Sequence, residues 1–275
     1  MKRILKKVII GSFLLVLLAF SAMSQVLDGI YVKEHVPTRR VVSYPHLREA
    51  DVMWSKRIWR VIPLGEKINL PLKMPYHNQT NDRRSLIDVI FDACIAGDLT
   101  AYIGEHAEEF AERYTPQEVK LYGASDDTVE VTQPDGSITK EISHREFNRD
   151  DVNKYRVKED WFFDKQRSVM DVRIIGIAPI VEDTVKKVEK PIFWIYFPEA
   201  RHIFINKETF NRFNDAERRT FDDVFFKRMF NSYIIKESNV EDRRIKEYAA
   251  GLDALLESQR IKEDIFIVEH DVWEL

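Results

Sequence analysis

The sequence predicts an α+β fold of two lobes, each with antiparallel strands packed by helices, behind an extended N-terminal arm and a cleaved signal peptide. Three observations predict it. The turn Gln133–Gly136 lies between two β-branched runs, a strong hairpin signal. Several other segments carry apolar residues at helical spacing. A weak internal repeat, in which Arg83–Phe91 resembles Arg218–Phe226, suggests that the two lobes are related.

The first 24 residues form the predicted signal peptide. Four basic residues lie within the first seven positions, and the apolar run Val8–Phe20 follows them. Ala22 and Ser24 place small side chains at the −3 and −1 positions of a cleavage site. The apolar run is shorter than the roughly 20 residues that span a bilayer. We therefore expect export with cleavage near Ser24/Gln25 and no transmembrane span in the mature chain, an uncleaved anchor being the alternative.

Charge and cysteine content narrow the class of protein. The net charge is −4, and loss of the four basic residues of the signal peptide brings it to −8. This acidity argues against general binding to nucleic acid or to anionic membranes. The single cysteine, Cys94, cannot form an internal disulfide and lies on the apolar stripe of a predicted helix, so we interpret it as a buried side chain rather than a nucleophile.

Residues 25–46 form the predicted arm, because they contain two prolines and show no lasting period. The arm either packs on the surface of its own chain, or is disordered, or docks on a neighbouring subunit. The first lobe is predicted over residues 47–147 and the second over residues 148–275, which ends in a long helix.

The first lobe opens with Ala50–Ile62, for which the spacing predicts a helix with a tryptophan on each of two nearly opposite sides. A strand fits the pattern less well, because alternation would place Lys56 and Arg60 among apolar residues. We expect Trp54 to face the core. Trp59 either faces inward as well or faces a partner together with Lys56 and Arg60.

The other elements are predicted from helix-capping residues and from the spacing of apolar residues. Ser85 is predicted to cap a helix that Gly97 ends, and Thr115 to begin a capping box. In the second lobe we predict strands at 169–178, 191–197 and 201–206, the first two forming an antiparallel hairpin, then a helix capped by Asp215. The final helix is predicted from about residue 239, with apolar residues at helical spacing: Ile245, Tyr248, Ala249, Leu252, Leu255, Leu256 and Ile261.

The sequence contains no nucleophile elbow, phosphate loop, Cys-x-x-Cys or His-Glu-x-x-His motif. We therefore predict no catalytic, cofactor-binding or metal-binding residues, and no enzymatic activity. The alternatives are an envelope hydrolase that uses dispersed residues such as Asp164, Glu199 and His202, or a ligand-binding module with an unrecognised site.

The chain is instead rich in aromatic residues and arginine, which anchor protein interfaces. The residues proposed on this ground for a protein interface are Lys56, Trp59, Arg60, Trp161, Phe193 and Trp194.

Three long blocks resemble the GldN/PorN family of gliding-motility and type IX secretion proteins of Bacteroidetes. They are Ala50–Ile62, Trp161–Pro179 and Arg218–Ser238. The resemblance spans essentially the whole mature chain, apart from the loops at 75–84 and 181–190.

This resemblance implies a structural role in the periplasm, peripheral to the outer membrane. It implies three contacts: an outer-membrane lipoprotein with which the family forms a ring, the periplasmic part of an inner-membrane motor component, and other copies of the chain within the ring. It implies no catalytic residues.

Overall fold

The computed structural model describes residues 38–74, 83–103, 110–121, 125–132, 138–145, 147–182, 189–214 and 216–273. The predicted signal peptide and residues 25–37 of the predicted arm lie outside these ranges. So does Asp215, the residue predicted to cap a helix.

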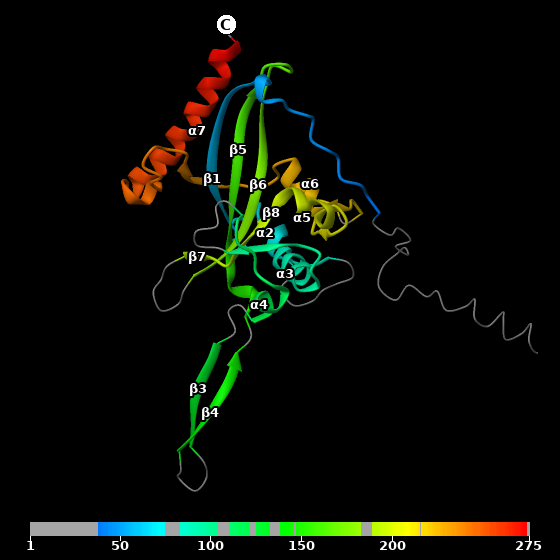
Figure 1. The fold of residues 1–275 in the computed structure, drawn as a ribbon, viewed down its shortest axis with the longest axis vertical. Coiled ribbons are helices and arrows are strands. Elements are labelled where there is room, and N and C mark those ends of the chain that lie inside the picture. Colours follow the sequence, from blue (N-terminus) through cyan, green and yellow to red (C-terminus); the bar gives the residue numbers. More distant parts are fainter. Residues whose placement is uncertain are drawn as a thin grey trace, which may run out of the picture. The chain divides into compact units, whose positions relative to one another are not determined.

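The described chain contains both strands and helices, and along the sequence its six consecutive strands β3 to β8 lie between α4 and α5 (Figure 1). The strands are β1 (Val52–Pro63), β2 (Ala101–Ile103), β3 (Ser125–Thr132), β4 (Ile138–Arg145), β5 (Val152–Asp164), β6 (Val169–Glu182), β7 (Glu189–Pro191), β8 (Phe193–Tyr196), β9 (Glu208–Thr209), β10 (Arg219–Thr220) and β11 (Tyr233–Glu237). The α-helices are α2 (Leu70–Lys73), α3 (Leu86–Ala96), α4 (Pro116–Leu121), α5 (Phe197–Phe204), α6 (Phe221–Phe226) and α7 (Leu252–Trp273). Short 3-10 turns are η1 (Glu49–Asp51), η2 (Arg149–Asp151) and η3 (Ile245–Glu247).

A seven-stranded antiparallel sheet organises the fold. Its order is β11-β1-β5-β6-β8-β2, and β7 pairs with β6. The long strands β1, β5 and β6 form its centre, so the sheet takes strands from both sides of residue 147. Two-stranded sheets are formed by β9 with β10 and by β3 with β4, the second of which is the predicted hairpin. The predicted α+β class, with antiparallel sheets packed by helices, is confirmed.

The prediction of a helix over Ala50–Ile62 is wrong. After the turn η1, this segment is β1, which pairs with β5 along most of its length. The argument against a strand was that Lys56 and Arg60 would lie among apolar side chains. They do, and each is neutralised there: Lys56 Nζ lies 2.6 Å from a carboxylate oxygen of Glu237, and Arg60 Nε lies 3.5 Å from one of Glu159. Paired charges are tolerated where isolated charges are not.

The main core lies between the sheet and helices α3, α5 and α6. Aromatic rings dominate it, with centroids 5.6–6.2 Å apart in several tilted and edge-on pairs. Its fully buried phenylalanines include Phe193, Phe197, Phe204, Phe221 and Phe225. Figure 1 shows α5 and α6 beside β6, whereas α7 lies on the opposite side of the three long strands, beside β1.

The predicted ends of α3 and the predicted start of α4 are confirmed, because nearby side chains and a glycine determine them. Ser85 accepts a hydrogen bond from the backbone N–H of Asp88, and Gly97 ends α3 with φ of 82°. Thr115 and Glu118 form the reciprocal bonds of a capping box before α4.

Two predictions in the second half are wrong. The predicted third strand, 201–206, instead continues α5, which begins after β8 with Pro198 in its first turn. The predicted helix near residue 215 begins only at Phe221. Its cap is Thr220, which completes a capping box with Asp223.

The C-terminal helix begins at Leu252, later than predicted. Gly251 precedes it with φ of 59°, a left-handed conformation that L-residues adopt at a cost. The helix packs on a second cluster of buried residues that includes Ile58, Ile261 and Ile265, with Trp54 partly buried against it. Ser258 fixes the contact, because its hydroxyl accepts a hydrogen bond of 3.0 Å from the backbone N–H of Ile234 on β11.

The described part of the predicted arm packs on its own chain. Residues 38–48 have no regular secondary structure. Tyr44 stacks on Phe226 with a centroid distance of 6.0 Å, and the guanidinium of Arg201 lies 4.6 Å from the centre of its ring. Arg173 donates a hydrogen bond of 2.6 Å to the carbonyl of Pro45. Whether another subunit meets the preceding residues stays a prediction.

Candidate protein-interaction site

The six residues predicted for an interface lie on three strands, β1, β5 and β8. Four have buried side chains, with exposed fractions of 5% for Trp59, 7% for Arg60, 0% for Phe193 and 2% for Trp194. Contrary to expectation, these four lie in the interior. Lys56 and Trp161 are partly exposed.

Phe193 and Trp194 point to opposite faces of the sheet, and each is buried because other side chains cover its face. Phe193 belongs to the main core, with its ring 5.8 Å from that of Phe91. Trp194 points into a smaller cluster with Tyr102 and Ala178. The run Phe193–Tyr196 therefore follows the near-continuous apolar pattern of a strand covered on both sides.

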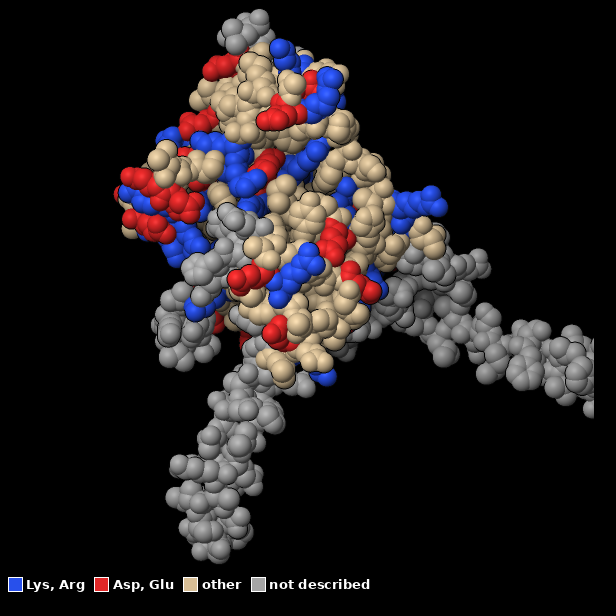
Figure 2. Space-filling view, in the orientation of Figure 1, with Lys and Arg blue, Asp and Glu red and all other residues tan. Residues whose placement is uncertain are grey.

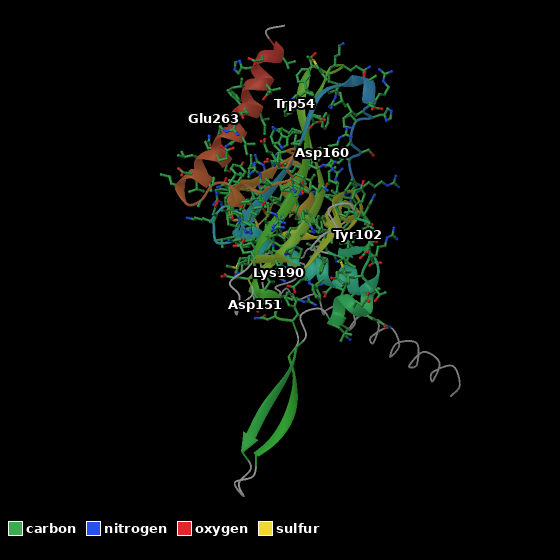
Figure 3. All side chains as sticks on the ribbon, turned by 60° about the vertical axis from the view of Figure 1, so that its left-hand side comes forward. Trp54, Tyr102, Asp151, Asp160, Lys190 and Glu263 are labelled. Carbon is green, nitrogen blue, oxygen red and sulfur yellow. The ribbon has the colours of Figure 1, made fainter. Side chains whose placement is uncertain are left out.

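A polar groove is the feature that brings Lys56 and Trp59 together. It has a volume of about 470 Å³, and it is lined by Ser55, Lys56, Arg57, Trp59, Lys158, Asp160, Ser238 and Asp242. Ion pairs cross or border it. Arg57 holds Asp160 through two hydrogen bonds of 2.6 and 2.8 Å, and Lys56 holds Glu237. Asp160 is labelled in Figure 3.

The inner wall of this groove is a tryptophan between two lysines. The ammonium of Lys236 lies 4.4 Å from the ring centroid of Trp59, and that of Lys158 lies 5.7 Å away. Both lysines are 3% exposed. Cation–π attraction strengthens when the cation is desolvated, so these contacts hold two charged groups in the interior. Lys236 also lies 2.7 Å from Asp242, a groove residue.

A second polar cluster surrounds the carboxylate of Glu159, which is fully buried. Arg228 donates to both of its oxygens at 2.9 and 3.1 Å, and the indole N–H of Trp161 donates at 3.0 Å. Arg60 completes the cluster. Burial lowers the pKa of the Arg60 guanidinium, an effect that Glu159 opposes and Arg228 increases. Trp161 thus links this interior cluster to the surface.

The groove is lined mostly by polar side chains and carries both signs of charge. Its lining contains serines, acids, bases and an indole, but no histidine or cysteine. Among the described residues, no group of three or more His, Cys, Asp or Glu could hold a metal ion. On the face seen in Figure 2, acidic and basic side chains alternate over the described surface. Such a mixed surface suits a polar protein contact.

Asp164, Glu199 and His202, the residues named for a hydrolase, line neither the groove nor the cavities beside β11 and beside Tyr44. Each has another role or setting. Asp164 accepts a hydrogen bond from Arg167 at 2.6 Å, Glu199 accepts one from Thr100 at 3.1 Å, and His202 is exposed on α5.

The pattern that predicts α7 does not separate its buried face from its outer face. Leu252, Leu255 and Leu256 are among the apolar residues at helical spacing, but these leucines are 59–70% exposed. The stripe that faces the sheet is Ala254, Ser258, Ile261 and Ile265. It was hidden because Ser258 interrupts its apolar pattern, and because the leucines offer a competing stripe of equal period.

Among the described residues, no helix is both long and apolar enough to cross a membrane. A search of curated proteins found no match to this chain. The family described as "Gliding motility associated protein GldN" matches residues 47–274, most of the chain and nearly all of its described part. This family belongs to the gliding-motility and type IX secretion machinery, of which it is a periplasmic component. The chain is therefore a member of the GldN family of gliding-motility and type IX secretion proteins.

Proposed function

We propose that this protein is a non-catalytic structural subunit of a periplasmic ring in the type IX secretion and gliding machinery. It lies at the outer membrane, to which a lipoprotein partner attaches it. The family match over residues 47–274 carries this proposal. The groove supports it, because its polar lining has the mixed charge of a contact surface and lacks the histidine or cysteine of common catalytic sites.

In a ring, each subunit uses two different surfaces, one for each neighbour. A further surface binds the lipoprotein, and another meets the periplasmic part of the inner-membrane motor component. We assign the groove, with Lys56 at its rim, to one of these contacts. Trp161 is the cross-strand partner of Lys56. However, its side chain lies with Trp54 and Ile58 on the other face of the sheet from Trp59, so we assign it to a different contact.

The experiment is co-expression of the mature chain with the outer-membrane lipoprotein of the same system. We expect a stable complex of ring size under native purification. If the two proteins separate and no large assembly forms, the structural proposal fails.

A matched pair of variants tests the groove. Lys56→Ala removes a rim side chain that is 31% exposed, and we expect it to weaken the complex. Lys190→Ala on β7, labelled in Figure 3, removes an exposed lysine away from the groove and should leave the complex intact. If both variants form the complex equally well, the groove is not one of the contact surfaces.

A further inference from the structure

Helix α7 has two apolar faces on opposite sides. At about 100° per residue, Ala254, Ser258, Ile261 and Ile265 share one side, which packs on the sheet. The opposite side carries Leu252, Leu255, Leu256, Phe266 and Ile267, whose exposed fractions range from 51% to 70%. An amphipathic helix that only covers a sheet needs one apolar face. The outer face has no such explanation within the described chain.

The outer face has a regular layout along the helix. Near its start is a leucine patch, formed by Leu252, Leu255 and Leu256. Near its end is an aromatic patch, formed by Phe266 and Ile267. Between them lie Gln259 and Glu263, which are joined by a hydrogen bond of 3.0 Å. Glu263 is labelled on α7 in Figure 3.

We propose that this outer face binds the outer face of α7 in a second copy of the chain, with the two helices antiparallel. The leucine patch of each copy then covers the aromatic patch of the other. This inference rests on the proposed function, because it names a surface through which a structural subunit associates with itself.

The register of the residues supports the antiparallel arrangement. When Leu256 is placed opposite Phe266 of a second antiparallel helix, Leu255 falls opposite Ile267. The same register places Gln259 opposite Glu263, an amide that can donate to a carboxylate. Leu255, Leu256, Gln259, Glu263, Phe266 and Ile267 thus each meet a compatible residue, and Leu252 falls opposite His270. In a parallel pair in register, Glu263 would instead meet the Glu263 of the second copy, and like charges repel.

Charge also favours the antiparallel arrangement. From residue 263 to residue 273 the helix carries four acids, Glu263, Asp264, Glu269 and Asp271, and no lysine or arginine. From residue 252 to residue 262 the acids Asp253 and Glu257 are balanced by Arg260 and Lys262. Antiparallel pairing brings the acidic end of each helix to this balanced end of the other, whereas parallel pairing would bring the two acidic ends together.

A contact of this kind is two-fold symmetric and closes with two copies. It therefore joins copies in pairs, and a ring built from such pairs needs another surface as well. Pairing is thus separable from ring formation in an experiment.

The test uses the mature chain alone, followed by sedimentation velocity across a range of concentrations. We expect a monomer–dimer equilibrium. Phe266→Glu should raise the dissociation constant by about 30-fold or more, as expected for loss of a central interface residue. Phe213→Glu, at a phenylalanine that is 75% exposed outside α7, is the matched control and should leave the equilibrium unchanged. Urea unfolding of both variants checks that they are folded.

Disulfide trapping tests the register. A mixture of Leu256→Cys and Phe266→Cys chains should form a covalent heterodimer on mild oxidation, whereas Leu256→Cys alone should not. A chain that stays monomeric at all concentrations overturns the inference, and so does equal cross-linking of Leu256→Cys alone. If Phe266→Glu leaves dimerisation unchanged but abolishes capture by the lipoprotein, the face belongs to the lipoprotein and the inference is again wrong.

The two proposals fail separately. A ring that forms with the lipoprotein from a Phe266→Glu chain would leave the proposed function standing without the α7 pair. A chain that dimerises through α7 but never forms a ring with the lipoprotein would support the α7 pair and contradict the proposed function.

Discussion

Glu159 on β5 is held by Arg228, which donates to its two carboxylate oxygens at 2.9 and 3.1 Å although the residues lie 69 positions apart. Arg228 reaches it from the turn after α6 with a φ of 52°, an unusual value for a residue other than glycine. This bond ties the turn after α6 to the middle of the central sheet. The same carboxylate lies 3.5 Å from the guanidinium of Arg60 on the neighbouring strand and compensates its buried charge.

We predict that Glu159→Gln destabilises the protein by about 3–5 kcal/mol, because it leaves the charges of Arg60 and Arg228 without their buried counter-ion. Urea unfolding followed by circular dichroism measures the loss. The control is Asp160→Asn, at the next position of the same strand. Asp160 pairs with an arginine whose side chain is 45% exposed, so this change should cost less than about 1 kcal/mol. Equal losses would show that the buried cluster contributes nothing special.

The two tryptophans of β1 should respond in the order opposite to that expected from a helix. Trp59 is 5% exposed and lies between two buried lysines, so Trp59→Ala should cost about 3–5 kcal/mol. Trp54 is only partly buried against the cluster under α7, so Trp54→Ala should cost clearly less. The free energy of unfolding of each variant, compared with that of the original chain, shows which substitution costs more. A greater loss for Trp54→Ala would contradict the placement of β1.

Cys94 should be inert in the folded protein. Burial raises the pKa of its thiol to about 12, and Glu199 adds to the shift. Since the thiolate is the reactive form, a thiol reagent at pH 8 should label the native chain far more slowly than the unfolded chain. Labelling followed by mass spectrometry measures both rates. Rapid labelling of the folded chain would refute the buried position of Cys94 in α3.

Asp92 should contribute a pH-dependent stability. Burial alone would raise the pKa of its carboxyl, but hydrogen bonds and charge from Arg84 and Arg149 outweigh burial and lower it. Since the folded pKa lies below that of the unfolded chain, about 3.9, the contribution is present above that pH. It is lost as the pH falls through the folded value.

The measurement compares Asp92→Asn with the original chain by thermal unfolding at pH 7 and pH 3. We expect a lower midpoint for the variant at pH 7 and a smaller difference at pH 3. Asp98→Asn, at an exposed residue just after the same helix, should show little difference at either pH. A difference for Asp92→Asn that does not shrink at pH 3 would contradict the ion pairs assigned to Asp92.

Much of the local structure was predictable from the sequence. The cap at Ser85, the stop at Gly97 and the capping box at Thr115 depend on side chains within four residues of the backbone groups they bind. The hairpin of β3 and β4 likewise follows from its turn. Interactions over such short separations are visible in any window of the chain.

The candidate site was only partly predictable. The sequence identified β1 as the important segment but left open whether Trp59 faces inward or faces a partner together with Arg60, because charged residues are usually exposed. The side chains that bury them come from far along the chain: Glu159 for Arg60, and Lys158 and Lys236 for Trp59. The pattern of residues within a short segment cannot reveal partners that lie so far along the chain.

By itself, then, the sequence determined the fold class, several of the helix ends, the hairpin and, through three long blocks, the family. The tertiary structure alone decided that Ala50–Ile62 is a strand and which face of α7 is buried. In both cases the apolar residues fit more than one period. The choice between the periods rested on contacts, such as that between Ser258 and the edge of β11, which exist only after distant segments have come together.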